Sequence, residues 1–190
     1  MNLKVFLSLF LPLAIIFNLI LPANASHHEA QNKTLLKIKY EQYPVFIPHF
    51  NKVDTEYYRG GQPKNKGYKE LSQLGIKTII DLRQFDRSTK KEEKLVEKYC
   101  IKFISIPMNP FNPPSQEQIK YFFSIINNPQ NQPVFVHCRE GKDRTGIMTA
   151  LYRINEYNWT TEQAYQEMLT LGYHQRLYPR QKWFLFSYKN

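Results

Sequence analysis

The sequence is short of cysteine and of acidic residues, and both shortages limit what the protein can be. Its 190 residues include only two cysteines, which are too few for a disulfide scaffold. Sixteen acidic residues stand against 26 lysines and arginines, and the net charge of +10 predicts anionic partners. The basic residues form no stripe and accompany no aromatic RNA-binding motif, so nucleic acid is not an expected partner. No internal repeat or low-complexity tract is visible either.

The first 25 residues differ in composition from the rest of the chain. One cation, Lys4, precedes an apolar run from Val5 to Leu21, and small residues follow at Ala23 and Ala25. This pattern predicts a signal peptide over 1–25 with cleavage after Ala25, and therefore export to the periplasm or secretion. An uncleaved membrane anchor is the alternative, and we expect membrane contact only in that case.

The remaining chain predicts a short flexible tail, 26–36, and one domain, 37–190. Short apolar runs alternate with helical segments, which is typical of an α/β domain. We therefore expect a single domain with a central, mostly parallel sheet of four to five strands flanked by helices. Three buried strands are predicted at Ile76–Leu82, Phe103–Ile106 and Pro133–His137, and an edge strand at Tyr57–Arg59.

Helices are predicted between these strands and after them. Two begin with capping boxes, Ser115 with Gln118 and Thr160 with Gln163, and the second helix is expected to end at Gly172. Weaker periodicity predicts helices at 65–74, 89–99 and 176–188. The apolar faces expected to be buried are Ile119, Phe122, Phe123 and Ile126 in the first capped helix, Ala164, Met168 and Leu171 in the second, and Ile147, Ala150, Leu151 and Ile154 in a helix that follows the motif described next.

The residues with the clearest chemistry follow the most apolar strand. The chain reads Val136-His-Cys-Arg-Glu-Gly-Lys-Asp-Arg-Thr-Gly146, and a helix then begins. A strand, a short turn and a helix N-terminus surround one concavity with backbone N–H groups and a positive dipole, which makes an anion site. A thiol there ionises easily, so Cys138 is a candidate nucleophile. Arg144 can bind two phosphate oxygens through its planar fork, and Thr145 can donate its hydroxyl to the sulfur as it leaves.

The stretch Cys138–Gly146 matches C-x5-R-[ST]-G and resembles the signature loop of cysteine-based protein tyrosine and dual-specificity phosphatases. Tyr58–Pro63 and Gly75–Arg83 look like the early strand-helix-strand unit of compact, bacterial-type members, so the resemblance covers most of 55–172. It implies a protein tyrosine phosphatase-like fold, a phosphocysteine intermediate, neither metal nor cofactor, and a phosphorylated protein or small molecule as substrate. The other loop residues expected to bind this substrate are His137, Arg139, Glu140, Gly141, Lys142 and Gly146.

The chain departs from this family at the general acid. Members usually carry an aspartate on a loop upstream of the cysteine, but the corresponding stretch, 106–114, contains no acidic residue. Asp143 occupies the position of an in-loop aspartate in phosphatases that resemble the myotubularins, so it is our candidate acid. Alternatively, Asp143 hydrogen-bonds backbone amides and orders the loop. Glu140, Asp81 and Asp86 are further candidates.

Several functions remain open at this point. Arg139 and Lys142 would favour inositol polyphosphates or phosphoinositides. The missing acid would also suit a catalytically silent phosphate-binding module, and the basic surface would suit a secreted interaction protein. A rhodanese-type sulfur transferase also uses a loop cysteine, but its loop lacks the arginine-threonine-glycine ending, so we rank it behind these alternatives. We expect Cys100 to be a small buried apolar side chain, and it could pair with Cys138 only if the fold brought them together.

Overall fold

The computed structural model describes residues 46–188, so the predicted signal peptide, the tail and the first residues of the predicted domain lie outside the described residues. Five strands of this part form one sheet in the order β1-β2-β5-β3-β4. The strands are β1 (Asn51–Lys52), β2 (Tyr57–Gly60), β3 (Thr78–Asp81), β4 (Lys102–Ser105) and β5 (Val134–His137). The helices are α2 (Asn65–Gln73), α3 (Arg87–Glu97), α4 (Gln116–Ile126), a short 3₁₀ helix η1 (Pro129–Asn131), α5 (Asp143–Tyr157), α6 (Thr161–Thr170) and α7 (Pro179–Ser187).

The sheet is mostly parallel, which confirms the predicted α/β fold. Strands β2, β5, β3 and β4 run parallel, and only the two-residue β1 pairs antiparallel, with β2. The prediction of an edge strand at Tyr57–Arg59 is wrong, because β1 covers that edge and all four residues of β2 are buried. The exposed edge is instead β4, whose first residue, Lys102, is exposed.

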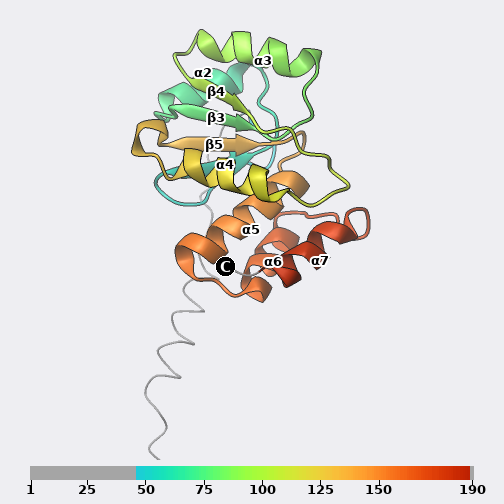
Figure 1. Ribbon diagram of the computed structural model, residues 1–190. Coiled ribbons are helices and arrows are strands. Elements are labelled where there is room, and N and C mark those ends of the chain that lie inside the picture. Colours follow the sequence, from blue (N-terminus) through green and yellow to red (C-terminus); the bar gives the residue numbers. More distant parts are fainter. Residues whose placement is uncertain (1–45, 189–190) are drawn as a thin grey trace, which may run out of the picture. The chain divides into compact units, whose positions relative to one another are not determined.

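Helices cover both faces of the sheet (Figure 1). On one face α2 and α3 bury the apolar cluster that includes Leu71, Ile79, Val96 and Phe135. On the other face lie α4 and α5, where the Tyr57 ring meets Phe122 and the Tyr57 hydroxyl hydrogen-bonds Thr149 at 2.9 Å. Helices α6 and α7 pack against α5 on the side away from the sheet (Figure 1).

Local sequence signals account for where three of the six described α-helices begin. Both predicted capping boxes are present, at Ser115 for α4 and Thr160 for α6, and a third at Asp86 begins α3. Gly75, with φ +79°, ends the turn after α2. The side chains of the predicted apolar faces are buried except for Phe123 and Leu171, which are half-buried. In α4 the buried face includes Ile125, which was not predicted, rather than Phe123.

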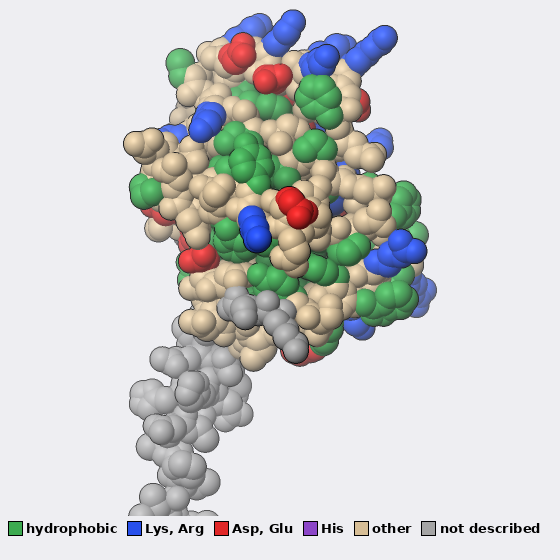
Figure 2. Space-filling model, in the orientation of Figure 1, with side chains coloured by type: hydrophobic (Ala, Val, Ile, Leu, Met, Phe, Trp, Pro, Cys, Tyr) green, Lys and Arg blue, Asp and Glu red, His purple; other side chains and the backbone are tan. Residues whose placement is uncertain are grey.

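Charged side chains are dispersed over the surface that Figure 2 shows. Lysines and arginines project at the α3 end and again near α7, with apolar and uncharged surface between them. Within residues 46–188, no helix combines the length and the apolar character needed to cross a bilayer.

Candidate active site

The predicted signature loop lies between the end of β5 and the start of α5. Cys138 is 2% exposed, and its Sγ accepts a hydrogen bond from the backbone N–H of Gly141 at 3.3 Å. Burial opposes ionisation of this thiol. The Thr145 hydroxyl, the Arg144 guanidinium and the N–H groups of Thr145 and Gly141 outweigh burial and lower the pKa of Cys138 below its ordinary value. The loop therefore favours a thiolate.

Glycine is needed at position 141 because the loop turns against strand β2 there. Gly141 has φ +79°, and a Cβ at this position would lie 2.3–2.5 Å from the backbone of Gly60 and Gly61. The Gly141 carbonyl accepts a hydrogen bond from Arg59 Nη2 at 2.6 Å. Strand β2 thus supports the loop through both its backbone and its one arginine.

Arg59 is a functional candidate that the sequence did not reveal. Its side chain is 1% exposed, and its Nε and Nη1 have no hydrogen-bond partner among the described residues. Burial lowers the pKa of Arg59 to about 10, against the opposing influence of Tyr57 and Cys138. A buried guanidinium beneath the loop adds positive potential to a site that must hold an anion. The only sequence signal is an arginine inside an otherwise buried strand.

Arg144 reaches the mouth of the loop from the first turn of α5. Its Nη1 donates to the carbonyls of Leu82 at 3.5 Å and Met108 at 3.4 Å, which orients the guanidinium beside two strand ends. A pocket of about 460 Å³ opens here and is lined by Gln62, Arg83, Gln84, Asp86, Ser88, Pro110, Arg139 and Arg144. Three of these residues are arginines, so the pocket suits an anionic ligand.

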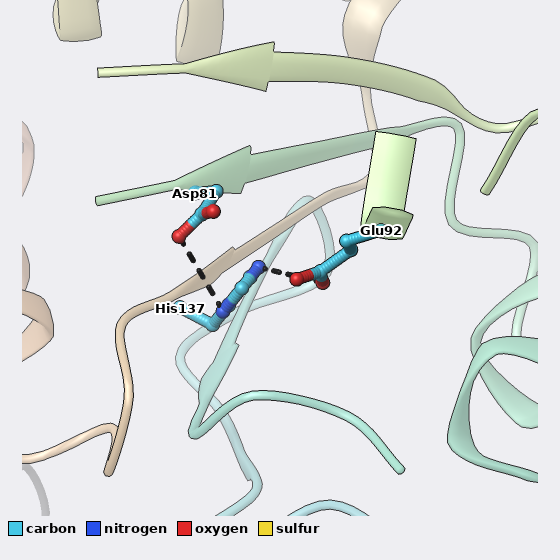
Figure 3. A group of neighbouring side chains, drawn as sticks. All are labelled: Asp81, Glu92 and His137. Atoms are coloured by element: carbon cyan, nitrogen blue, oxygen red, sulfur yellow. Dashed lines mark ion pairs between the residues drawn. The ribbon is translucent and has the colours of Figure 1, made fainter. Parts of the chain in front are cut away.

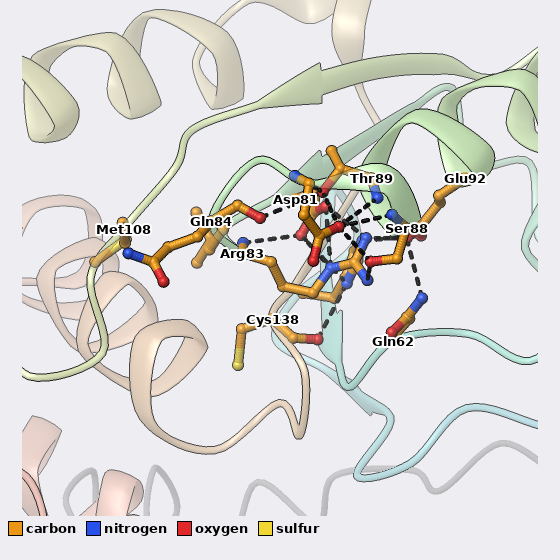
Figure 4. Close-up of polar contacts among 12 residues, drawn as sticks. Gln62, Asp81, Arg83, Gln84, Ser88, Thr89, Glu92, Met108 and Cys138 are labelled. Carbon is orange, nitrogen blue, oxygen red and sulfur yellow. Dashed lines mark hydrogen bonds and ion pairs between the residues drawn. The ribbon is translucent and has the colours of Figure 1, made fainter.

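A buried ionic network lies directly behind Cys138. His137 Nε2 is 3.1 Å from Glu92 Oε1, and His137 Nδ1 is 3.9 Å from Asp81 (Figure 3). Arg83 lies between the two carboxylates and pairs with both, at 2.7 Å to Asp81 and 2.5 Å to Glu92 (Figure 4). With His137 protonated, two cations balance two anions.

The carboxylates stabilise the charged imidazole. Burial by itself lowers the pKa of His137, but Glu92 and then Asp81 raise it above its ordinary value. The His137 Nδ1 also lies 3.1 Å from the carbonyl of Cys138. The network therefore fixes the residue before the nucleophile. Neither Arg83 nor Glu92 was predicted as a site residue, because both lie far in sequence from the signature loop, in the segment that runs from β3 into α3.

Asp81, Glu92 and His137 also offer one potential metal-ligand atom each, all within 4.8 Å of one another. Arg83 donates to both carboxylates and already supplies the positive charge that a metal would bring. The donor set is therefore better described as an ion-pair network than as a metal centre.

The structure separates the candidate acids. Asp81 is fully buried and bonded to Arg83. Asp86 lines the pocket, but hydrogen bonds from Ser88 and from the N–H of Thr89 hold its pKa below the ordinary value. Glu140 pairs with Lys142 at 3.4 Å, the pairing with a basic neighbour that the sequence allowed.

Asp143 is the first residue of α5, and its carboxylate contacts the segment between α6 and α7. It accepts a hydrogen bond from the backbone N–H of His174 at 2.9 Å, and the His174 Nδ1 lies 3.1 Å away. The predicted backbone-amide contact is therefore present, together with a histidine that sequence reasoning missed. Thr145 and Gly146 are buried in the first turn of α5.

The loop upstream of α4 is held by α7. Gln181 Nε2 donates to the carbonyl of Pro110 at 3.0 Å, and Arg180 Nη1 donates to Asn112 Oδ1 at 3.1 Å. Phe111, 63% exposed, packs on Tyr178 with ring centroids 5.6 Å apart. The loop thus borders the site with amides and an aromatic ring but with no carboxylate of its own.

The expectation that Cys100 is buried is wrong. Cys100 has φ +56° in the turn between α3 and β4, and this left-handed turn directs its side chain outward. It precedes β4, whereas Cys138 follows β5, so the parallel strands separate the two residues by the full strand length. This distance rules out direct pairing between them in this fold.

Comparisons with known proteins identify the family of the chain. A family model described as "DSP-PTPase phosphatase fused to NAD+ Kinase" matches residues 48–181. The chain is 34% identical over 118 residues to "Probable tyrosine-protein phosphatase DG1060" of Dictyostelium discoideum, spanning 60% of this chain and 70% of that protein.

Solved structures show the same fold. The catalytic domain of the PP-IP phosphatase SIW14 from S. cerevisiae, in complex with citrate, aligns with TM-score 0.68 and 24% identity over 76% of this chain and 88% of that one. TpbA of P. aeruginosa in complex with pTyr aligns with TM-score 0.66 and 18% identity over 78% and 90%. The chain therefore belongs to the dual-specificity-type family described as DSP-PTPase phosphatase fused to NAD+ kinase, and it is a cysteine-based phosphatase.

Proposed function

We propose that Cys138 is the nucleophile of this phosphatase and that the loop from Arg139 to Arg144 binds the phosphoryl group. The thiolate attacks phosphorus, and an S–P bond forms as the ester P–O bond breaks. Arg144 binds two phosphoryl oxygens, and the loop N–H groups bind the others. Water then attacks the phosphocysteine, and Thr145 donates a hydrogen bond to the departing sulfur.

The observation that carries this proposal is the position of the Cys138 thiol, which is 2% exposed and accepts a hydrogen bond from the Gly141 N–H in the loop before α5. The loop N–H groups and Arg144 also lower the pKa of this thiol. A buried thiol without these N–H groups and Arg144 would be protonated at neutral pH and inert. The test is hydrolysis of an activated aryl phosphate by the protein and by Cys138→Ser. We expect Cys138→Ser to lose turnover but to bind vanadate. Binding of vanadate without turnover by the parent protein would indicate a phosphate-binding module instead.

We propose phosphorylated protein, with phosphotyrosine first, as the substrate class. TpbA, whose fold is similar, binds pTyr in its complex, which supports phosphotyrosine as a substrate of this chain. In this chain Phe111 and Tyr178 provide aromatic surface next to Pro110 of the pocket. Aromatic walls favour an aryl ester over a small alkyl ester.

Inositol polyphosphates or phosphoinositides are the second candidate. Arg83, Arg139 and Arg144 line one pocket, and SIW14, whose fold is similar, is a PP-IP phosphatase. A substrate with several phosphates would use Arg139 as well as Arg144. The two candidates are separated by measuring kcat/KM of the parent and of Arg139→Ala on a phosphotyrosine peptide and on an inositol polyphosphate. Arg139→Ala should lower kcat/KM by about tenfold or more only on the multiply phosphorylated substrate.

Export is a further part of the proposal. The apolar run and the small residues before Ser26 support cleavage of 1–25, and the domain then acts in the periplasm or outside the cell. Sequencing the N-terminus of the protein recovered from its native compartment tests this. A chain that begins at Ser26 supports export, and a chain that retains Met1 and partitions with membranes indicates an anchor.

A further inference from the structure

His174 is held rigidly against the carboxylate that precedes Arg144. Its backbone N–H and its Nδ1 both contact the Asp143 carboxylate, at 2.9 and 3.1 Å. Its carbonyl accepts hydrogen bonds from the N–H groups of Leu177 and Tyr178, at 2.9 and 3.0 Å. The residue is thus fixed at both its main-chain polar groups and at one ring nitrogen. Such immobilisation is typical of a side chain whose orientation matters.

The segment that carries His174 borders the signature loop. Gly172, with φ +87°, turns the chain so closely past Lys142 that a Cβ there would lie 3.3 Å from the lysine side chain. Farther along, Tyr178 packs on Phe111 of the upstream loop. These contacts place the segment beside both the signature loop and the loop upstream of α4. Burial raises the pKa of Tyr178, and the nearby charge of Asp143 raises it further.

The ring of His174 has one nitrogen left for chemistry. Its side chain is 35% exposed, and Nε2 has no hydrogen-bond partner among residues 46–188. Among the described residues, the ring contacts the Asp143 carboxylate from α5 at 3.1 Å and the Tyr178 ring from its own segment, with ring centroids 6.5 Å apart. The Asp143 carboxylate is engaged by His174 through the backbone N–H and the Nδ1, and this contact fixes the orientation of the ring.

We propose that His174 is the proton donor of this phosphatase and that Asp143 is its positioning residue. The proposal rests on the function proposed above. It accounts for the absence of a carboxylate in 106–114, because the acid comes instead from the segment between α6 and α7. The arrangement matches the general logic of an imidazole whose second nitrogen is held by a carboxylate.

The proton balance closes over the two chemical steps. As the S–P bond forms and the P–O bond breaks, the imidazolium of His174 gives its Nε2 proton to the leaving oxygen. In the second step the neutral imidazole takes a proton from the attacking water, the new P–O bond forms, and the thiolate of Cys138 departs. The enzyme returns to its starting protonation state.

His174→Asn is the sharpest test, because an asparagine amide can keep the Nδ1-like hydrogen bond to Asp143 while Nε2 is removed. The substrates are phenyl phosphate, a poor leaving group, and 2,4-dinitrophenyl phosphate, a good one. We expect kcat/KM to fall by about 100-fold or more on phenyl phosphate and by less than about threefold on the dinitrophenyl ester. Asp143→Asn should also lower kcat/KM more on phenyl phosphate than on the dinitrophenyl ester, but by a smaller factor than His174→Asn. The matched control is His49→Asn, since His49 Nδ1 also bonds this loop, at the Glu140 carbonyl, and the change should leave the leaving-group dependence unchanged.

The pH profile provides a readout that a purely structural role would not change. On phenyl phosphate, His174→Asn should lack the alkaline limb that a proton donor gives to the kcat/KM profile of the parent. Equal losses on both esters, or an unchanged phenyl phosphate rate in a folded His174→Asn, would overturn the assignment while leaving Cys138 as nucleophile. If Cys138→Ser retains turnover, the proposed function itself fails. His174→Gln serves as the second variant if His174→Asn does not fold.

Discussion

Replacing Glu92 with glutamine tests whether the buried network behind the nucleophile stabilises the fold. Glu92 pairs with His137 at 3.1 Å and with Arg83 at 2.5 Å, and all three side chains are less than 10% exposed. The change leaves Asp81 alone to balance two cations. Breaking a buried ion pair by removing one partner costs about 3–5 kcal/mol, and we expect about 3 kcal/mol here because the amide can still hydrogen-bond.

Unfolding experiments measure this cost directly. A loss of about 3 kcal/mol should lower Tm by about 10 °C in a domain of this size. The matched control is Glu93→Gln, which makes the same charge change at the next position of α3, where the side chain is exposed. We expect its effect to stay within about 0.5 kcal/mol. Equal shifts for Glu92→Gln and Glu93→Gln would refute the claim that the network is stabilising.

The same network predicts how stability depends on pH. Because Glu92 and Asp81 raise the pKa of His137 in the folded protein, this group stabilises the fold below its unfolded pKa, and the contribution is lost as pH rises through its folded pKa. Burial opposes ionisation of Asp81, but His137 and Arg83 outweigh it and lower the pKa of Asp81, so that contribution is lost as pH falls through the folded value. The Tm difference between the parent and Glu92→Gln should therefore shrink, without vanishing, above the His137 titration, because Glu92 still pairs with Arg83. A difference that grows at alkaline pH would contradict this.

Three further predictions concern the loop and the helices. Gly141→Ala should abolish turnover and lower the free energy of unfolding by about 3 kcal/mol or more, because a Cβ would clash with the backbone at the end of β2. Gly75→Ala is the control, since Gly75 has the same φ of +79° but nothing within 4 Å of an added Cβ, and urea unfolding should show a loss of only about 1 kcal/mol. Arg144→Met should raise the pH at which an activated aryl phosphate begins to turn over, because Arg144 helps to lower the pKa of Cys138; an unmoved acid limb would argue against that role. Ser115→Ala should destabilise the domain by about 1 kcal/mol without changing kcat, since the hydroxyl caps α4.

The signature loop could be predicted because its chemistry is local. Cys138, Arg144 and Thr145 lie in one strand, turn and helix start, and the order of these elements fixes the N–H groups that surround the anion site. The capping boxes at Ser115 and Thr160 are local in the same sense. Their partners lie three residues away, so pattern and structure agree.

The supporting residues could not be predicted because their contacts are distant in sequence. Arg59 meets Gly141 across 82 residues, and His174 meets Asp143 across 31. Neither has a periodicity that indicates a partner. The edge-strand error has a related cause, since β1 contributes only two residues and is too short to produce a strand pattern. Cys100 was misplaced because a single left-handed turn decides which way its side chain points.

The position of β5 in the sheet explains why these distant residues meet at one loop. Strand β5 lies between β2 and β3, so each neighbour can support the loop that follows it. From β2, Arg59 reaches the Gly141 carbonyl on the α5 face, while on the opposite face His137 joins the carboxylates of β3 and α3. Because the sheet separates these two supports, the orientation of Cys138 is determined from both sides, and losing either one should displace the thiol even where the other remains intact.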